Sequence, residues 1–409
     1  MDKRVLRILG FVMVFGLSIT FAQAADTVKI GVIQPFTGPT ALWGVEAKRG
    51  IDMAVDKINK AGGALQKKVE VILEDSKGDP STAISCAEKL ITYDKVVAFT
   101  GIYASAECLA VLAAMKKYEP IFLQQGGTVA KVDQMYGKER WLFLGHPRAP
   151  DYQRNVADFL DTIKPKPKRI AIAYEDTSYG SDHSKYAKEY LTKLGFEIVT
   201  FEIFKGGALD HSGMLTKLKA ANPDLFYWLG YAGDSILLTK QAKELGFSPK
   251  LMGDTMGVGF PEFGSSLKKD AVYVFGLDMW IPSAKYPAST QYPQFYPKTD
   301  DWVAKYKRLY NKEPHYYSVF NYTSLITLIN AINKAGTTEK EKLIAAMEAT
   351  DTMTPCGYLK FTKNDFGALH QGYKEMVIYQ WQKGEKVVLW PQKAAGGKLI
   401  YPMPAWDKR

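Results

Sequence analysis

The chain has 409 residues, a formal net charge of +10 at pH 7 and 46% hydrophobic residues. This composition is that of an ordinary globular protein, and the length exceeds what one hydrophobic core usually serves, so we expect at least two domains. The lysines are scattered rather than grouped with aromatic residues on one predicted helix face, which gives nucleic-acid binding no support.

The N-terminus predicts a secretory signal peptide. Three basic residues near the start precede the apolar stretch 8–21, and the small-residue pattern of residues 22–24 follows it. The stretch is too short to cross a bilayer of roughly 30 Å. We expect residues 1–24 to be removed. Because no cysteine stands at the cleavage point to take a lipid anchor, we expect a free periplasmic protein.

From Val28 the chain alternates short apolar runs with amphipathic stretches, which is typical of a parallel sheet covered by helices. The first series has predicted strands at 28–33, 69–73, 96–100 and 121–123, and predicted helices at 46–61, 81–93 and 105–118. A second series has predicted helices at 151–163, 179–194, 212–221 and 234–245, and predicted strands at 169–174, 197–204 and 225–228.

The C-terminal part continues with a stretch rich in Pro and Tyr, two predicted helices and a run of strands and turns. The helices cover 300–310 and 316–335, and the strands fall within 357–400. We therefore predict an α/β protein with two domains. One contains residues 25–147 plus 281–352, and the other contains 148–280 plus 353–409.

Three cysteines are present, Cys86, Cys108 and Cys356. In an oxidising compartment an unpaired thiol is unusual. The first two fall on consecutive predicted helices, so a disulfide between Cys86 and Cys108 and two buried thiols are the alternatives.

No motif of a known enzyme class occurs. The chain lacks a Gly-x-Ser-x-Gly elbow, a His-Glu-x-x-His helix, a Walker A loop and a Gly-x-Gly-x-x-Gly turn after a strand. The five histidines are dispersed without metal-ligand spacing. We expect no catalytic residues, no metal and no cofactor.

Polar groups instead gather at the carboxyl ends of predicted strands, where open α/β sheets bind ligands. Ser105 opens a helix after the strand that ends at Thr100, and Gly126, Gly127 and Thr128 follow the next strand. Hydroxyls and free backbone N–H groups there would suit a carboxylate. Ser105 could equally act as a helix cap.

Aromatic residues recur at similar places, namely Trp43 in the loop after the first strand, Tyr103, Tyr179 and Tyr231. One aromatic residue in a loop is more often part of a core. Four at strand ends indicate a cleft lined for an apolar or aromatic ligand.

These residues resemble the leucine/isoleucine/valine-binding proteins. The similarity is carried by VKIGV (28–32), TGP (37–39), GIDMAVDKIN (50–59), GG (62–63), DSKGDP (75–80), RIAI (169–172), YG (179–180) and DLFY (224–227). The resemblance implies the type I periplasmic-binding-protein fold, with two Rossmann-like lobes joined by three crossovers around a central ligand cleft. It also implies a monomeric, non-enzymatic substrate-binding component of an ABC importer, whose partner is the inner-membrane permease. The same fold serves periplasmic sensors that signal to a receptor kinase, which is the alternative function.

The resemblance also implies roles for individual residues. Ser105, the backbone of Ala104 and the turn from Gly126 through Gly127 to Thr128 would hold the ligand's carboxylate. Trp43, Tyr179 and Tyr231 would form aromatic walls.

The family's partner for an α-ammonium aligns with Thr255, so the expected carboxylate is missing there. Either Asp254 turns into the cleft in its place, or the ligand lacks an α-amino group. The candidate ligands are therefore a branched-chain or aromatic amino acid, or an aromatic or other small organic acid or amide.

Overall fold

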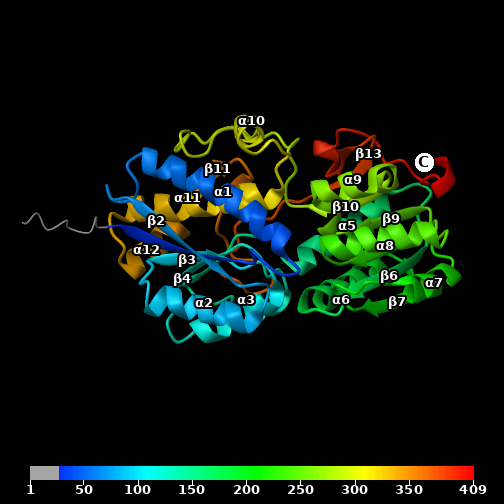
Figure 1. Ribbon diagram of the computed structural model, residues 1–409, viewed down its shortest axis with the longest axis horizontal. Helices are drawn as coiled ribbons and strands as arrows, with labels where there is room; N and C mark the ends of the chain where they lie inside the picture. The colour runs from blue at the N-terminus through cyan, green and yellow to red at the C-terminus, as the bar shows by residue number, and fades with distance from the viewer. Residues whose placement is uncertain (1–26) are drawn as a thin grey trace, which may run out of the picture.

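The computed structural model describes residues 27–409, so the predicted signal peptide lies outside the described part of the chain. Figure 1 shows two halves side by side, each a mainly parallel sheet flanked by helices. The predicted α/β class with two Rossmann-like lobes is confirmed. We call the half that contains strand β1 lobe 1 and the other half lobe 2.

The sheet of lobe 1 has five parallel strands in the order β2-β1-β3-β4-β5. The strands are β1 (Val28–Gln34), β2 (Val69–Asp75), β3 (Ala98–Gly101), β4 (Ile121–Gln124) and β5 (Leu142–Leu144). The order reverses at β1, so the carboxyl ends of β1 and β3 border the crevice in which such sheets bind ligands.

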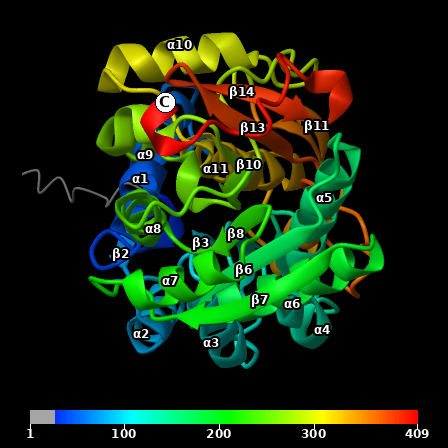
Figure 2. The ribbon, with the colours of Figure 1, turned by 90° about the vertical axis from the view of Figure 1, so that its right-hand side faces the viewer.

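The sheet of lobe 2 has seven strands in the order β14-β13-β10-β9-β8-β6-β7. Its strands are β6 (Arg169–Glu175), β7 (Glu197–Phe204), β8 (Leu225–Leu229), β9 (Leu251–Asp254), β10 (Val274–Asp278), β13 (Val377–Gln382) and β14 (Glu385–Trp390). The first five are parallel, and the last two add an antiparallel hairpin beside β10. Figure 2 views the molecule from this side.

Helices cover both sheets. They are α1 (Ala41–Lys60), α2 (Pro80–Thr92), α3 (Ser105–Met115), α4 (Ala130–Tyr136), α5 (Ala149–Thr162), α6 (Ser178–Lys193), α7 (Ser212–Ala220), α8 (Ala232–Glu244), α9 (Pro261–Leu267), α10 (Thr299–Tyr310), α11 (Tyr316–Ala335) and α12 (Lys340–Glu348). In α11 every residue from Tyr316 to Ile329 is buried, as in a helix packed on all sides. Within residues 27–409 no helix combines the length and the apolar character that a membrane span requires.

The chain passes between the lobes three times, after β5, after β10 and before β13. The third passage lies later than the sequence predicted. Residues beyond 353 first form the two-stranded sheet of β11 (Asp351–Thr354) and β12 (Gly357–Lys360). They then lie beside β5, where the Leu144 N–H donates to the His370 carbonyl at 2.8 Å. Pairing with this segment covers the free edge of the lobe 1 sheet, which explains why the chain stays there.

Several local predictions differ from the structure. Helix α1 begins at Ala41 rather than residue 46, so Trp43 lies in its first turn and not in a loop. Helices α4, α9 and α12 were not predicted. Cys86, Cys108 and Cys356 are free and buried, so the disulfide considered for the first two is absent. Their thiols instead approach backbone carbonyls, that of Asp75 for Cys86 and that of Ile102 for Cys108, each at 3.6 Å.

Candidate functional site

Ser105 is the first residue of α3, at the carboxyl end of β3. The helix cap is Ala104, whose N–H donates to the Glu107 carboxylate at 3.1 Å, so Ser105 does not cap the helix. Ser105 is only 3% exposed, yet within residues 27–409 its hydroxyl has no hydrogen-bond partner. This hydroxyl and the unpaired N–H groups of the first turn of α3 are donors that a carboxylate can accept.

The turn 126–128 packs directly against the loop that precedes Ser105. The Gly127 N–H donates to the Tyr103 carbonyl at 2.9 Å. A Cβ atom on Gly126 would lie 2.2 Å from the same carbonyl oxygen, and one on Gly127 would lie 2.3 Å from the sulfur of Cys108. Only glycine allows this approach, so these two residues hold the loop of Ser105 and the turn of Thr128 together.

We expect Gly127→Ala to disrupt the site. Gly127 has φ of +60°, and the new methyl group would meet Cys108, so the variant should lose at least about 2 kcal/mol of stability. Gly213→Ala is the matched control, because a Cβ atom there has nothing within 4 Å and lies on α7. Its stability should be unchanged or raised by up to about 1 kcal/mol. Urea denaturation of both variants measures the difference, and equal midpoints would contradict the proposed packing.

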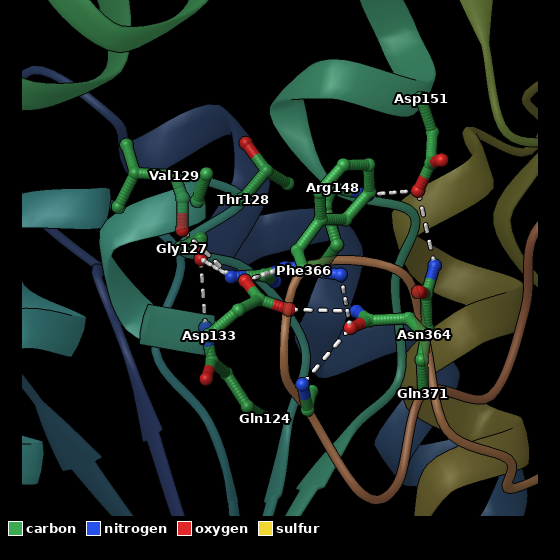
Figure 3. A network of polar contacts seen from close by, with 12 residues as sticks. Gln124, Gly127, Thr128, Val129, Asp133, Arg148, Asp151, Asn364, Phe366 and Gln371 are labelled. Atoms are coloured by element: carbon green, nitrogen blue, oxygen red, sulfur yellow. Dashed lines mark hydrogen bonds and ion pairs between the residues drawn. The ribbon is translucent and has the colours of Figure 1, made fainter. Parts of the chain in front are cut away.

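Arg148, at the first passage between the lobes, holds the turn 126–128 in place through hydrogen bonds (Figure 3). Its side chain is fully buried, and Nε donates to Asp133 Oδ2 at 2.7 Å. Nη2 donates to the carbonyls of Gly127 at 3.0 Å and Val129 at 2.9 Å. Asn364 binds the other oxygen of Asp133 at 2.7 Å. The ion pair therefore holds both backbone carbonyls that flank Thr128.

The predicted aromatic residues meet across the interface between the lobes. Tyr179 and Tyr231 of lobe 2 are stacked with ring centroids 5.4 Å apart, and Tyr103 of lobe 1 lies 5.8 Å from Tyr231. Trp43 stacks on Tyr103 at 4.5 Å and contacts Phe260 of lobe 2 edge-on at 4.5 Å. The two lobes are thus closed against each other in this structure.

A narrow pocket lies between the lobes at this point. It is lined by Tyr103, Ser105, Gly126, Gly127, Thr128, His146, Tyr152, Tyr179, Tyr231, Met256 and Tyr316. The structure therefore brings seven of the eleven predicted site residues together around one pocket. Trp43 and Ala104 do not line the pocket. Trp43 stacks on Tyr103, and Ala104 directly precedes Ser105.

Four lining residues were not predicted: His146, Tyr152, Met256 and Tyr316. The first two lie at the first passage between the lobes, and Tyr316 opens α11, which follows the second passage. Burial lowers the pKa of His146 to about 3, with a contribution from the nearby Arg148 cation, so its ring is neutral. Its Nε2 and the Tyr152 hydroxyl are buried without a hydrogen-bond partner among the described residues.

Asp254 and Thr255 do not line the pocket. The Asp254 carboxylate accepts hydrogen bonds from the Ser235 hydroxyl at 2.7 Å and from the N–H groups of Thr255 at 2.6 Å and Gly257 at 3.0 Å. It is fully buried, and burial raises its pKa to about 7. The Thr255 hydroxyl binds the hydroxyl of Tyr179. Asp254 therefore organises the turn after β9 and does not turn into the cleft.

No residue that lines the pocket in the described part of the chain is an Asp, Glu, Lys or Arg. Residues 27–409 also contain no group of three or more His, Cys, Asp and Glu side chains placed to hold a metal ion. The pocket therefore presents hydroxyls, backbone N–H groups and aromatic rings to a ligand.

The profile of a family described as periplasmic binding protein matches residues 27–386. The chain belongs to the periplasmic binding protein family. A Leu/Ile/Val-binding protein homolog of Brucella abortus is 30% identical over 396 residues, which cover 93% of this chain and 96% of that protein. The resemblance to leucine/isoleucine/valine-binding proteins is thus confirmed, and the family places this periplasmic binding protein in the periplasm.

Solved structures of other periplasmic binding proteins share the fold. A branched-chain amino acid transporter substrate-binding protein of Streptococcus pneumoniae, in complex with isoleucine, superposes with a TM-score of 0.78 at 21% identity and covers 92% of this chain and all of its own. A solute-binding protein of an ABC transporter from Rhodopseudomonas palustris, in complex with 3,4-dihydroxybenzoic acid, has a TM-score of 0.76 at 22% identity and covers 94% of this chain and all of its own.

Proposed function

We propose that this protein is the substrate-binding component of an ABC importer and that its ligand is a small carboxylate without an α-ammonium group. The observation that carries the proposal is the lining of the pocket between the lobes. It offers neutral donors at Ser105 and Thr128, aromatic walls, and no carboxylate.

The carboxylate would lie at the end of the pocket formed by lobe 1. The Ser105 hydroxyl and the first turn of α3 approach it from one loop, and the turn 126–128 approaches it from the next. Hydrogen bonds to an ionised group contribute about 1.5–3 kcal/mol each, so a few neutral donors are enough for tight binding. A helix N-terminus adds a favourable field for an anion.

The body of the ligand would lie among Tyr103, Tyr179 and Tyr231, whose rings offer apolar faces. The pocket is small, which limits the ligand to a compact molecule. The Tyr152 hydroxyl and His146 Nε2 provide a place for one further polar group, because each is buried without a protein partner.

An α-amino acid fits this lining poorly. Its ammonium would be buried among tyrosines without a carboxylate, and an unpaired buried charge costs several kcal/mol. Asp254, the carboxylate considered for this role, already accepts hydrogen bonds from Ser235, Thr255 and Gly257 of its own lobe. Among the two relatives, the one bound to an aromatic acid is therefore the better guide to this ligand than the one bound to isoleucine.

The test compares pairs of ligands that differ only by the α-amino group. Calorimetric titration would measure Kd for 3-phenylpropionate against phenylalanine and for 4-methylpentanoate against leucine. We expect the acid of at least one pair to bind about 100-fold more tightly than its amino acid, which corresponds to about 2.7 kcal/mol. Tighter binding of the amino acid in both pairs would contradict the proposal, as would failure of all four compounds to bind.

A transport role also requires that the ligand leave unchanged. Ligand extracted from the denatured complex should have the same mass and amount as the ligand added. Loss of ligand with the appearance of a product would instead indicate an enzyme.

A further inference from the structure

Thr128 is bonded across the cleft to a histidine of lobe 2. Its hydroxyl lies 2.8 Å from Nε2 of His183 on α6. The adjacent residue Asp182 also crosses the interface and accepts a hydrogen bond from the Ala130 N–H at 2.8 Å. Two consecutive residues of α6 thus hold the segment that contains Thr128, and both contacts join lobe 2 to lobe 1.

The partners of His183 determine which ring nitrogen carries the proton. Its Nδ1 lies 3.1 Å from the amide nitrogen of Gln153, and the amide oxygen of Gln153 accepts a hydrogen bond from the Tyr227 hydroxyl at 2.9 Å. An amide nitrogen can only donate, so Nδ1 must accept. A neutral imidazole with an accepting Nδ1 carries its proton on Nε2 and donates it to Thr128.

The ring is held in this neutral state by its surroundings. His183 is fully buried, and burial together with the Arg148 cation lowers its pKa to about 3. The rings of Tyr152 and Tyr179 pack on it with centroids at 5.0 and 4.4 Å. The carboxyl group of the adjacent residue Asp182 accepts a hydrogen bond from the Ala130 N–H.

We propose that His183 is a positioning residue that occupies the oxygen of Thr128 from lobe 2 and so directs the hydroxyl proton of Thr128 to the ligand's carboxylate on closure. The inference rests on the proposed function and adds to it a direct link between anion recognition in lobe 1 and the position of lobe 2. The hydrogen bonds then all point the same way. Tyr227 donates to Gln153, Gln153 to His183, His183 to Thr128, and Thr128 to the ligand.

A double-mutant cycle tests the link, with 3-phenylpropionate and 4-methylpentanoate as probes at pH 7.5. His183→Met and Thr128→Val should each weaken binding about tenfold, because each removes a hydrogen bond that orders the anion site. The double variant should be about as weak as either single variant, since both remove the same chain of bonds. Additive losses would overturn the inference. His370→Met, at a buried histidine bonded to Leu142 and Glu348, controls for the loss of a buried ring.

The pH profile provides a second readout that a structural role would not change. If opening of the lobes exposes the His183 ring, its pKa there is the ordinary value near 6.5, and closure below that pH releases a proton. The affinity of the wild type should fall about tenfold per pH unit below about pH 6.5. His183→Gln, which retains a donor but does not titrate, should bind equally from pH 5.0 to 7.5, and a parallel fall in this variant would contradict the role of His183. Failure of both probes to bind the wild type would instead overturn the proposed function.

Discussion

Replacing Ser105 and Thr128 together by alanine should weaken the binding of a small carboxylate by at least about 100-fold. The two side chains lie on adjacent loops at the lobe 1 end of the pocket. Each hydroxyl donates to the ligand's carboxylate in our account, and such bonds contribute about 1.5–3 kcal/mol apiece. Calorimetric titration with the tighter-binding acid of the two pairs measures the loss.

The variant should remain folded, because within residues 27–409 the Ser105 hydroxyl makes no hydrogen bond and the Thr128 hydroxyl makes one, to His183 of the other lobe. Thermal denaturation without ligand checks this expectation. The matched control is the Ser85→Ala and Thr92→Ala pair on α2, where both hydroxyls are exposed and donate only to backbone carbonyls of their own helix. An unchanged Kd in the Ser105 and Thr128 double variant would show that the carboxylate binds elsewhere.

Replacing Arg148 by methionine should destabilise the protein by about 3–5 kcal/mol, because it leaves Asp133 as an uncompensated buried charge. Both side chains have no exposed surface, and the same guanidinium holds the carbonyls of Gly127 and Val129. Ligand binding should weaken as well, since the turn that carries Thr128 loses these two anchors. Urea denaturation gives the change in the free energy of unfolding.

Arg140→Met is the control for this change. Arg140 also binds a carboxylate, Glu341, at 2.8 Å, but its side chain is 52% exposed. Exposed ion pairs contribute about 0–1 kcal/mol, so this variant should be close to the wild type. Similar losses in the two variants would contradict the role assigned to burial of the Arg148 pair.

The part of the site that depends on local sequence was predictable. Ser105 and the turn 126–128 follow strands whose apolar pattern is plain, and in a parallel sheet these strand ends lie at one edge. The stacking of Tyr179 on Tyr231 could be anticipated in the same way, since each follows a strand of the second series.

The remainder depends on contacts between segments far apart in the chain. His146 and Tyr152, both at the first passage between the lobes, line the pocket, which no local pattern indicates. The direction of Asp254 is set by Ser235 and by the turn at Gly257. The late return of the chain to lobe 2 results from pairing between Leu144 and the segment at His370. Periodicity carries no information about such pairings.

A crystal structure of the protein with the tighter-binding acid of the two pairs would show directly where the carboxylate binds. We predict that the carboxylate oxygens lie within about 3.2 Å of the Ser105 and Thr128 hydroxyls, with the body of the ligand between the rings of Tyr103 and Tyr231. A carboxylate bound to a charged side chain, or a ligand outside the pocket between the lobes, would contradict the account.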